Sequence, residues 1–128
     1  MKVVGIGCRK GVATADVLTL IAAVLAERGL SQDCLDALAT VPLKRNERAL
    51  IDAAHRLGLP LRIPTAAQMD AIMTNTLTRS FASLAATGMP SASEVAALAA
   101  AGPNARLLAA RHIGAGITCA IAVSKEVP

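Results

Sequence analysis

The sequence predicts an α/β fold, a three-layer α/β/α arrangement with a mixed, mainly parallel sheet of about five strands. Short apolar runs typical of strands alternate with helical segments in the order β-α-β-α-β-α-α-β-β. This order favours right-handed crossovers, with helices on both faces of the sheet. The last two strand runs, residues 106–110 and 117–123, flank the turn at residues 114–116 and predict an antiparallel hairpin. At 128 residues the chain forms one domain, residues 1–128.

The first strand and helix are predicted near the N-terminus. Residues 3–7 form an apolar, β-branched run that ends in glycine, which is typical of a buried strand. We expect Thr14 to cap the helix that follows and Gly29 to end it. The apolar residues of this helix recur at the spacing of a single buried face: Val17, Leu18, Ile21, Val24 and Leu25.

A second strand and helix follow. The strand candidate covers residues 37–43, and Asn46 is the predicted cap of a helix that Gly58 closes. The predicted inward positions of that helix are Leu50, Ile51, Ala54 and Leu57. This assignment places residues 44–47 directly after the end of a strand.

The third strand is short and covers residues 61–63. Thr65 and Gln68 then stand at the spacing of a capping box, in which each side chain accepts a hydrogen bond from the backbone N–H of the other residue. The helix that this box opens is predicted to run through about Met73.

The segment before the last helix is the least regular part of the sequence. Residues 74–90 are rich in Thr and Ser and predict a mobile connection that contains a helical piece. Ser91 and Glu94 form a second capping box, and an alanine-rich helix follows. That helix is expected to stop at residues 102–103, a Gly-Pro pair.

Composition and charge restrict the function. The chain has thirteen basic and nine acidic residues, a formal net charge of +4, and nine of its bases are arginine. Arginine makes bidentate contacts with carboxylates and phosphates, so an anionic small ligand is favoured over a cationic one. Phe81 is the single aromatic residue and no basic run is present. The sequence therefore predicts no nucleic-acid partner.

The cysteines and the apolar stretches predict a soluble, cytoplasmic protein with reduced thiols. Cys8, Cys34 and Cys119 are odd in number and widely separated, so neither a disulfide framework nor a zinc site is indicated. No apolar stretch approaches the ~20 residues that a membrane-spanning helix needs, and no targeting signal precedes the first strand. We expect no membrane partner, no metal and no cofactor.

The loop between the first strand and the first helix predicts an anion site. Gly7, Cys8, Arg9, Lys10 and Gly11 combine two glycines and two cations just before a helix N-terminus. Backbone N–H groups in such a place bind anions. The alternative is an ordinary connection with two solvated bases, because the spacing matches neither a Walker A loop nor a dinucleotide-binding fingerprint.

Lys44 and Glu47 follow the second strand and are expected close to this loop. Neighbouring parallel strands joined by one crossover helix end at the same edge of a sheet, where ligands bind. The two side chains form either a charge pair that positions a ligand or a solvated start of a helix. Arg111 follows the fourth predicted strand and could approach the same site from the hairpin.

Three further side chains carry reactive groups. His112 could act as an acid or a base, but it has no obvious carboxylate partner, and the case for His55 is weaker. Cys8 lies beside two cations, which could lower its pKa and make the thiol nucleophilic. Packing as a small, buried residue is the favoured interpretation of Cys8. No catalytic residue is therefore assigned.

Three blocks of the sequence resemble one known family. They are Gly-Ile-Gly-Cys-Arg-Lys-Gly at residues 5–11, Ala-Thr-Val-Pro-Leu-Lys-Arg-Asn-Glu at residues 39–47, and residues 88–102, which start with Gly-Met-Pro-Ser-Ala-Ser-Glu. A closing Thr-Cys-Ala-Ile-Ala-Val strand at residues 118–123 adds to them. Over essentially its whole length, the chain resembles the CobE family of cobalamin-biosynthesis proteins, which is equivalent to the C-terminal domain of CbiG.

The resemblance implies a part in building the corrin ring of vitamin B12. CbiG proteins open a lactone on a cobalt-containing precorrin and release acetaldehyde, and this chain resembles only their C-terminal domain. Precorrins carry many acetate and propionate groups, which suit a basic domain with cationic loops. We expect a carrier or accessory factor that binds such an anionic corrin precursor. The alternatives are a hydrolase resembling CbiG, with Lys44, Glu47 or His112 transferring protons, and a non-catalytic docking partner of another pathway enzyme.

Overall fold

The sheet is mixed and has five strands. The computed structural model describes residues 1–44, 46–79, 92–102 and 105–124. The strands lie in the order β3-β2-β1-β5-β4, and their bounds are β1 Lys2–Cys8, β2 Ala37–Ala39, β3 Leu61–Arg62, β4 Arg106–Gly114 and β5 Ile117–Val123. β1, β2 and β3 pair in parallel, whereas β5 runs antiparallel to both β1 and β4. Four of these five strands thus point in one direction, and the predicted mixed, mainly parallel sheet is confirmed.

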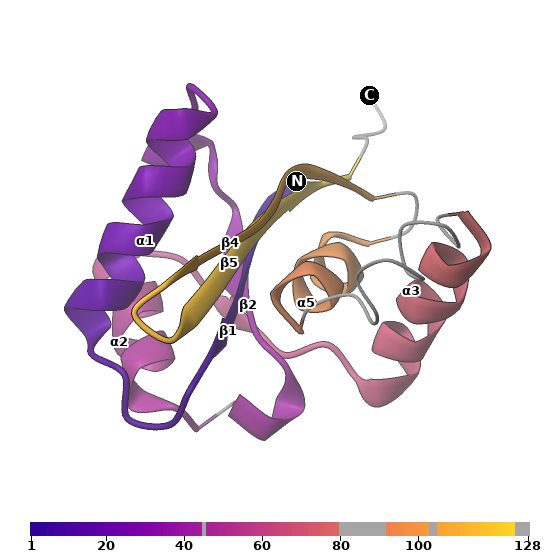
Figure 1. Cartoon of the computed structure of the whole chain (residues 1–128), viewed down its shortest axis with the longest axis horizontal. Helices are drawn as coiled ribbons and strands as arrows, with labels where there is room; N and C mark the ends of the chain where they lie inside the picture. The colour runs from indigo at the N-terminus through magenta and orange to yellow at the C-terminus, as the bar shows by residue number, and fades with distance from the viewer. Residues whose placement is uncertain (45, 80–91, 103–104, 125–128) are drawn as a thin grey trace.

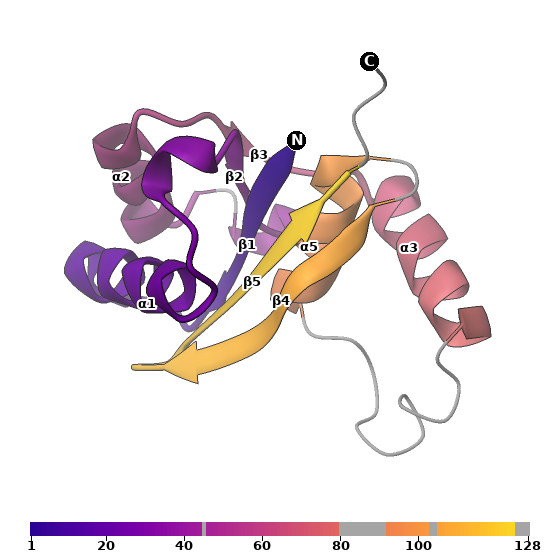
Figure 2. The same cartoon turned by 90° about the horizontal axis from the view of Figure 1, so that it is seen from above.

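Helices cover both faces of this sheet, which confirms the predicted three layers (Figure 1). On one face lie α1, Thr14–Glu27, and α2, Arg48–Leu57. On the other face α5, Ala92–Ala101, packs on the strands, and α3, Ala66–Arg79, packs outside α5. Figure 2 shows α5 between α3 and the strands. Among the described residues, no helix is both long and apolar enough to span a bilayer.

Large aliphatic side chains fill the space between the sheet and α1 and α2. Their buried cluster is formed mainly by Val4, Ile6, Val17, Ile21, Val24, Leu38, Leu50, Ile117 and Ile121. Four of the five predicted inward residues of α1 are buried, and the fifth, Leu18, is partly buried against the same cluster. The helical spacing of apolar residues therefore predicted this face of α1 correctly.

The interface between the sheet and α5 is built from small side chains. It contains Val3, Ala37, Ala39, Ala96, Ala97, Ala101, Ala105 and Ala122. At Gly5 the helix comes so close that a Cβ atom there would lie 2.0 Å from the backbone oxygen of Ser93. Only glycine fits at this contact, and it sets how near α5 lies to β1.

Several predicted boundaries need correction. β2 ends at Ala39 rather than at residue 43, and a 3₁₀ turn at Pro42–Lys44 follows it. α3 continues to Arg79, past the predicted end at Met73. The capping box that opens α3 is confirmed: Gln68 accepts a hydrogen bond from the Thr65 N–H at 2.8 Å, and the Thr65 hydroxyl accepts one from the Gln68 N–H at 3.1 Å.

The C-terminal hairpin is confirmed, with a longer first strand than predicted. β4 extends to Gly114, so Arg111 and His112 lie within the strand and not after it. Its turn places Ala115 and Gly116 at positive φ, 54° and 77°, as a tight two-residue hairpin turn requires. Ser91, the first residue of the other predicted capping box, lies outside the described residues.

Candidate functional site

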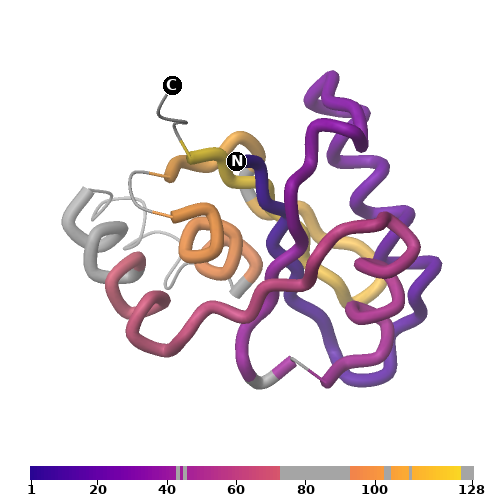
Figure 3. Tube along the Cα trace, turned by 180° about the vertical axis from the view of Figure 1, so that it is seen from behind, coloured from indigo at the N-terminus to yellow at the C-terminus, as the bar shows by residue number. Residues whose placement is uncertain are grey.

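The carboxyl ends of the parallel strands and the first turns of the helices meet at one edge of the sheet. β1 leads into α1, β2 into α2 and β3 into α3, and each of these helices begins where its strand ends. Figure 3 shows from behind that the β1–α1 connection and the segment leading into α2 lie at the same end of the molecule. Ligands bind at this edge in open α/β sheets, and helix N-termini favour anions there.

The predicted loop after β1 is fixed by the hairpin turn. The Arg9 N–H donates a hydrogen bond to the carbonyl of Gly116 at 3.0 Å. The aliphatic part of the Arg9 side chain lies over the same turn, because a Cβ at Gly116 would lie 3.3 Å from Arg9 Cδ. Gly11 has a φ of +81°, which glycine adopts without strain. Arg9 and Lys10 are exposed, so their charges are available to a ligand.

Glu47 joins this loop to the start of α2. It is the N-cap residue of α2, and its Oε1 accepts a hydrogen bond from the Gly11 N–H at 3.2 Å. The prediction that Asn46 caps the helix is therefore wrong. The carboxylate that the sequence suggested as part of a ligand-positioning charge pair instead holds two strand-end segments together.

The Cys8 thiol lies within the influence of both charges that follow β2. Burial and then the Glu47 carboxylate raise the pKa of Cys8, while the Lys44 ammonium opposes them. The side chain is partly buried against the core. A raised pKa keeps the thiol protonated near neutral pH, so the packing interpretation of Cys8 holds and nucleophilic activation is not supported. The predicted site residues Cys8, Gly11, Lys44 and Glu47 are thus brought together.

The first turns of α1 and α2 have backbone N–H groups without side-chain caps. The N-cap of α1 is Ala13, and Thr14 is already the first helical residue, so the predicted Thr14 cap is wrong. The Glu47 N-cap of α2 also makes no side-chain cap hydrogen bond. Uncapped N–H groups in a first turn are hydrogen-bond donors for water or for an anionic ligand.

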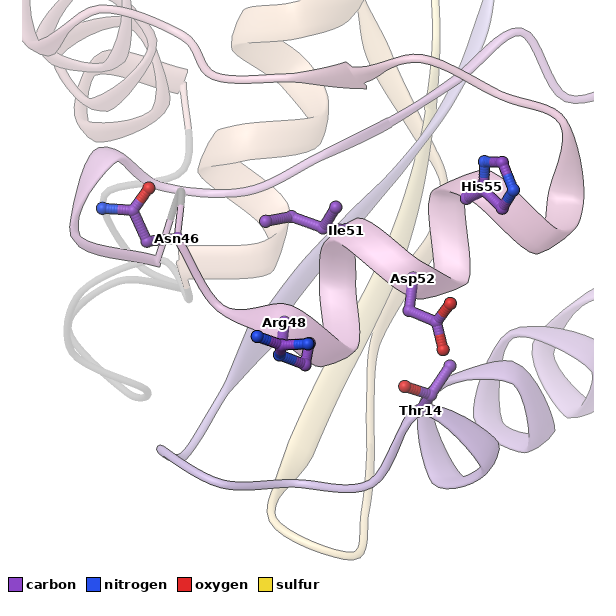
Figure 4. A pocket seen from close by; sticks show the side chains of 6 residues that line it. All are labelled: Thr14, Asn46, Arg48, Ile51, Asp52 and His55. Carbon is purple, nitrogen blue, oxygen red and sulfur yellow. The ribbon is translucent and has the colours of Figure 1, made fainter.

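Two hollows flank the Gly7–Gly11 loop. A groove of about 620 Å³ runs beside α2 and is lined by Thr14, Asn46, Arg48, Ile51, Asp52 and His55 (Figure 4). A smaller hollow of about 330 Å³ lies at the hairpin and is lined by Gly7, Cys8, Arg9, Ile113, Gly116 and Thr118. No local sequence pattern predicts this groove, although His55, whose imidazole is a reactive group, lines it.

Arg111 and His112 lie on β4, and neither of them lines the two hollows beside the Gly7–Gly11 loop. Arg111 is exposed on β4, the edge strand that β5 separates from β1. His112 Nε2 lies 2.8 Å from Glu27 Oε2, so the histidine has the carboxylate partner that the sequence did not reveal. Glu27 ends α1, about 20 Å from its first turn at a 1.5 Å rise per residue.

Thr40 is a buried residue that sequence reasoning missed. Its hydroxyl donates a 2.7 Å hydrogen bond to the carbonyl of Ile6 where β2 leaves the sheet. This bond satisfies a backbone group of β1 directly after the last residue of β2. Within the part of the chain that is described, no group of three or more His, Cys, Asp or Glu side chains could hold a metal ion.

The chain matches a known family over almost all of its length. The model of the family described as Cobalamin synthesis G C-terminus covers residues 2–122. The chain belongs to this family. The resemblance predicted from three blocks of sequence is therefore confirmed, and the chain is a member of a family of cobalamin-biosynthesis proteins.

Individual members of the family are similar in sequence and in structure. The chain is 29% identical to Protein CobE of a Sinorhizobium species over 120 residues, which are 94% of this chain and 78% of that protein. A crystal structure of the cobalamin biosynthesis protein chiG from Agrobacterium tumefaciens is 43% identical, with a TM-score of 0.83, and the match covers 98% of this chain and 100% of that one. A cobalt-precorrin-5A hydrolase of Priestia megaterium is 36% identical over 55 residues, 43% of this chain but only 15% of the hydrolase.

Proposed function

We propose that this protein binds an anionic corrin precursor, a precorrin-type tetrapyrrole, at the carboxyl edge of its sheet and serves as a carrier or accessory factor in cobalamin biosynthesis. The observation that carries the proposal is the convergence of the Gly7–Gly11 loop, Lys44 and two helix starts without side-chain caps at one edge. Membership of a cobalamin-biosynthesis family supports the choice of ligand class.

The charges at this edge suit a polycarboxylate. Exposed or partly exposed cations follow β1 and β2 or begin the next helix: Arg9, Lys10, Lys44 and Arg48. The carboxylate of Glu47 accepts a hydrogen bond from the Gly11 N–H, so this negatively charged group also holds the loop in place. Several cations and N–H donors can bind the acetate and propionate groups of one macrocycle through charge-assisted hydrogen bonds.

The test is a titration of hydrogenobyrinic acid, a metal-free corrin, followed by its absorbance. Arg9→Ala and Lys44→Ala should each weaken binding by about 1.5–3 kcal/mol, the usual contribution of a hydrogen bond to a charged group. Raising the salt concentration should also weaken binding, because the site is open to water. Arg28→Ala and Arg106→Ala serve as charge-matched controls. They remove exposed arginines at the C-terminal end of α1 and at the start of β4, away from the proposed site. Wild-type affinity in the Arg9/Lys44 double variant would overturn the proposal.

A second candidate function is hydrolysis of a precorrin lactone, which the match to the cobalt-precorrin-5A hydrolase favours. The groups nearest the loop that could transfer a proton are Glu47 and Lys44. Hydrolysis requires turnover that is lost in Glu47→Gln. If the protein binds the substrate but the substrate stays intact after long incubation, hydrolysis is excluded and the carrier function is retained. A protein that docks on another pathway enzyme without binding the corrin would fail the titration and still be captured by that enzyme.

A further inference from the structure

Ile51 is exposed on a helix whose other large aliphatic residues point inward. The buried residues of α2 are Ala49, Leu50, Ala53 and Ala54. Ile51 was predicted among the inward positions, but 48% of its surface is exposed, so this prediction is wrong. Among the described residues, Ile113 is the other large aliphatic side chain with such exposure. The core does not use Ile51, and its exposed apolar surface is available for a ligand.

In the groove, side chains that can form hydrogen bonds lie on either side of Ile51 along α2. Arg48 precedes it by three residues and His55 follows it by four, so all three lie on one side of α2. Figure 4 shows Ile51 between the Asn46 turn and His55, with Arg48 at the start of the helix. Asp52 also lines the groove, but its carboxylate lies 3.3 Å from the guanidinium of Arg56, which offsets its charge.

We propose that this groove is the subsite for the ring edge of the ligand. Ile51 packs against the apolar surface of the macrocycle, while Arg48 and His55 bind carboxylate groups at its periphery. This inference rests on the proposed function and narrows it to a ligand with an apolar ring and an anionic rim. A simple polycarboxylate would use the cations but would gain nothing from Ile51.

The groove is favoured over the hairpin hollow by its size and its charges. The groove has about 620 Å³ against about 330 Å³ for the hollow. It begins at Thr14 in the first turn of α1, directly after the Gly7–Gly11 loop, so one ligand can contact both. Of the described residues that line the hollow around Ile113, Arg9 is the one with a charge, and part of its side chain already lies over Gly116.

The experiment compares Ile51→Ser with Ile113→Ser in the hydrogenobyrinic acid titration. Ile51→Ser should raise the Kd about tenfold, because the ligand would no longer bury the exposed apolar surface of an isoleucine when it binds. Arg48→Ala should raise the Kd about tenfold as well. Ile113→Ser should change the Kd less than about twofold. Circular dichroism and thermal melting check that each variant folds, and Ile51→Thr, which keeps the branched shape, is a second variant at the same position.

Salt distinguishes an apolar contact from a charge effect. The Ile51→Ser ratio of Kd values should persist between 0.05 and 0.5 M salt, at roughly its low-salt value, whereas the Arg48→Ala ratio should shrink through screening. Wild-type affinity in both Ile51 variants, or an equal loss in Ile113→Ser, would overturn the groove as the subsite. If the Arg9/Lys44 double variant still loses binding in that case, the proposed function survives. A wild-type protein that binds no hydrogenobyrinic acid would overturn both.

Discussion

The two faces of the sheet hold their helices in different ways. Between the strands and α1 and α2 the contacts are made by large, branched side chains such as Ile21 and Leu50. Between the strands and α5 they are made by alanine and glycine, so the backbones approach closely. Packing of α1 and α2 therefore depends on large side chains that fill the space beneath them. Packing of α5 depends on side chains small enough to let the backbones come close. Since α1, α2 and α5 all begin at the same edge, the geometry of the candidate site depends on both kinds of packing.

The largest effect is expected at Gly5, on the close-packed face. Gly5→Val should lower the free energy of unfolding by about 4 kcal/mol or more, above the usual range for overpacking, because the obstacle is a backbone oxygen that cannot rotate away. Urea unfolding followed by circular dichroism measures this loss. Gly114→Ala is the matched control, because its new Cβ would meet only the flexible end of Leu20 at 3.5 Å. A Gly5 variant as stable as the control would show that α5 can shift at little cost.

Leu50→Ala tests the opposite sensitivity on the other face. Leu50 is fully buried among large side chains, so truncation should cost about 3 kcal/mol by removing apolar contacts and leaving a cavity. Its neighbour Ile51 is 48% exposed, so Ile51→Ala should cost less than about 1 kcal/mol. Chemical denaturation of the two variants provides the comparison. Equal losses at the two positions would contradict the inward and outward sides assigned to α2.

Thr40→Val tests whether the buried hydrogen bond directly after β2 is needed where this strand leaves the sheet. Valine keeps the shape of threonine but leaves the carbonyl of Ile6 buried without this hydrogen bond. We expect a loss of about 1–3 kcal/mol, the cost of an unsatisfied buried acceptor. Denaturation again measures it, with Thr19→Val as a control because the Thr19 hydroxyl bonds its own helix at an exposed position. A neutral Thr40→Val would mean that the departure of β2 does not need this bond.

Local signals predicted the parts of the fold that depend on neighbouring residues. The inward face of α1, the Thr65–Gln68 box and the hairpin turn each arise from residues only a few positions apart. The proximity of Cys8, Lys44 and Glu47 could also be predicted, because it follows from the order of strands and helices alone.

Features set by distant contacts could not be predicted. β2 ends at Ala39, and the hydroxyl of the next residue, Thr40, donates a hydrogen bond to the carbonyl of Ile6, which lies 34 residues away. The rotation of α2 is fixed by its packing on α1 and the strands, where Ala49 and Ala53 fill the interface, so periodicity within the helix misplaced Ile51. Arg111 was expected after a strand, but pairing with β5 extends β4 past it.

The pH dependence of stability reports how dry the large-side-chain face is. Burial raises the pKa of the Cys119 thiol from 9.0 to about 12. The unfolded thiol ionises first as pH rises, so this contribution to stability is complete below about pH 9 and is lost toward pH 12. At pH 10 the loss should be about 1.4 kcal/mol. Denaturation at pH 8, 9 and 10 should show a smaller decline for Cys119→Ala than for wild type. If stability declines with pH as steeply in Cys119→Ala as in wild type, a group other than Cys119 causes the decline. Cys34→Ala is the matched control.

The smallest effect is expected from the contact between His112 and Glu27, which ties edge strand β4 to the last turn of α1. The two groups lie 2.8 Å apart, but the Glu27 side chain is 60% exposed, so solvent screens the pair. A double-mutant cycle with Glu27→Gln and His112→Gln isolates the pair from the other contacts of His112. We expect a coupling of about 0.5 kcal/mol that falls in high salt. Because Glu27 lies at the far end of α1 from the Gly7–Gly11 loop, corrin affinity should be unchanged in all three variants. A loss of affinity in His112→Gln alone would move the ligand toward the hairpin and give this histidine a part in binding.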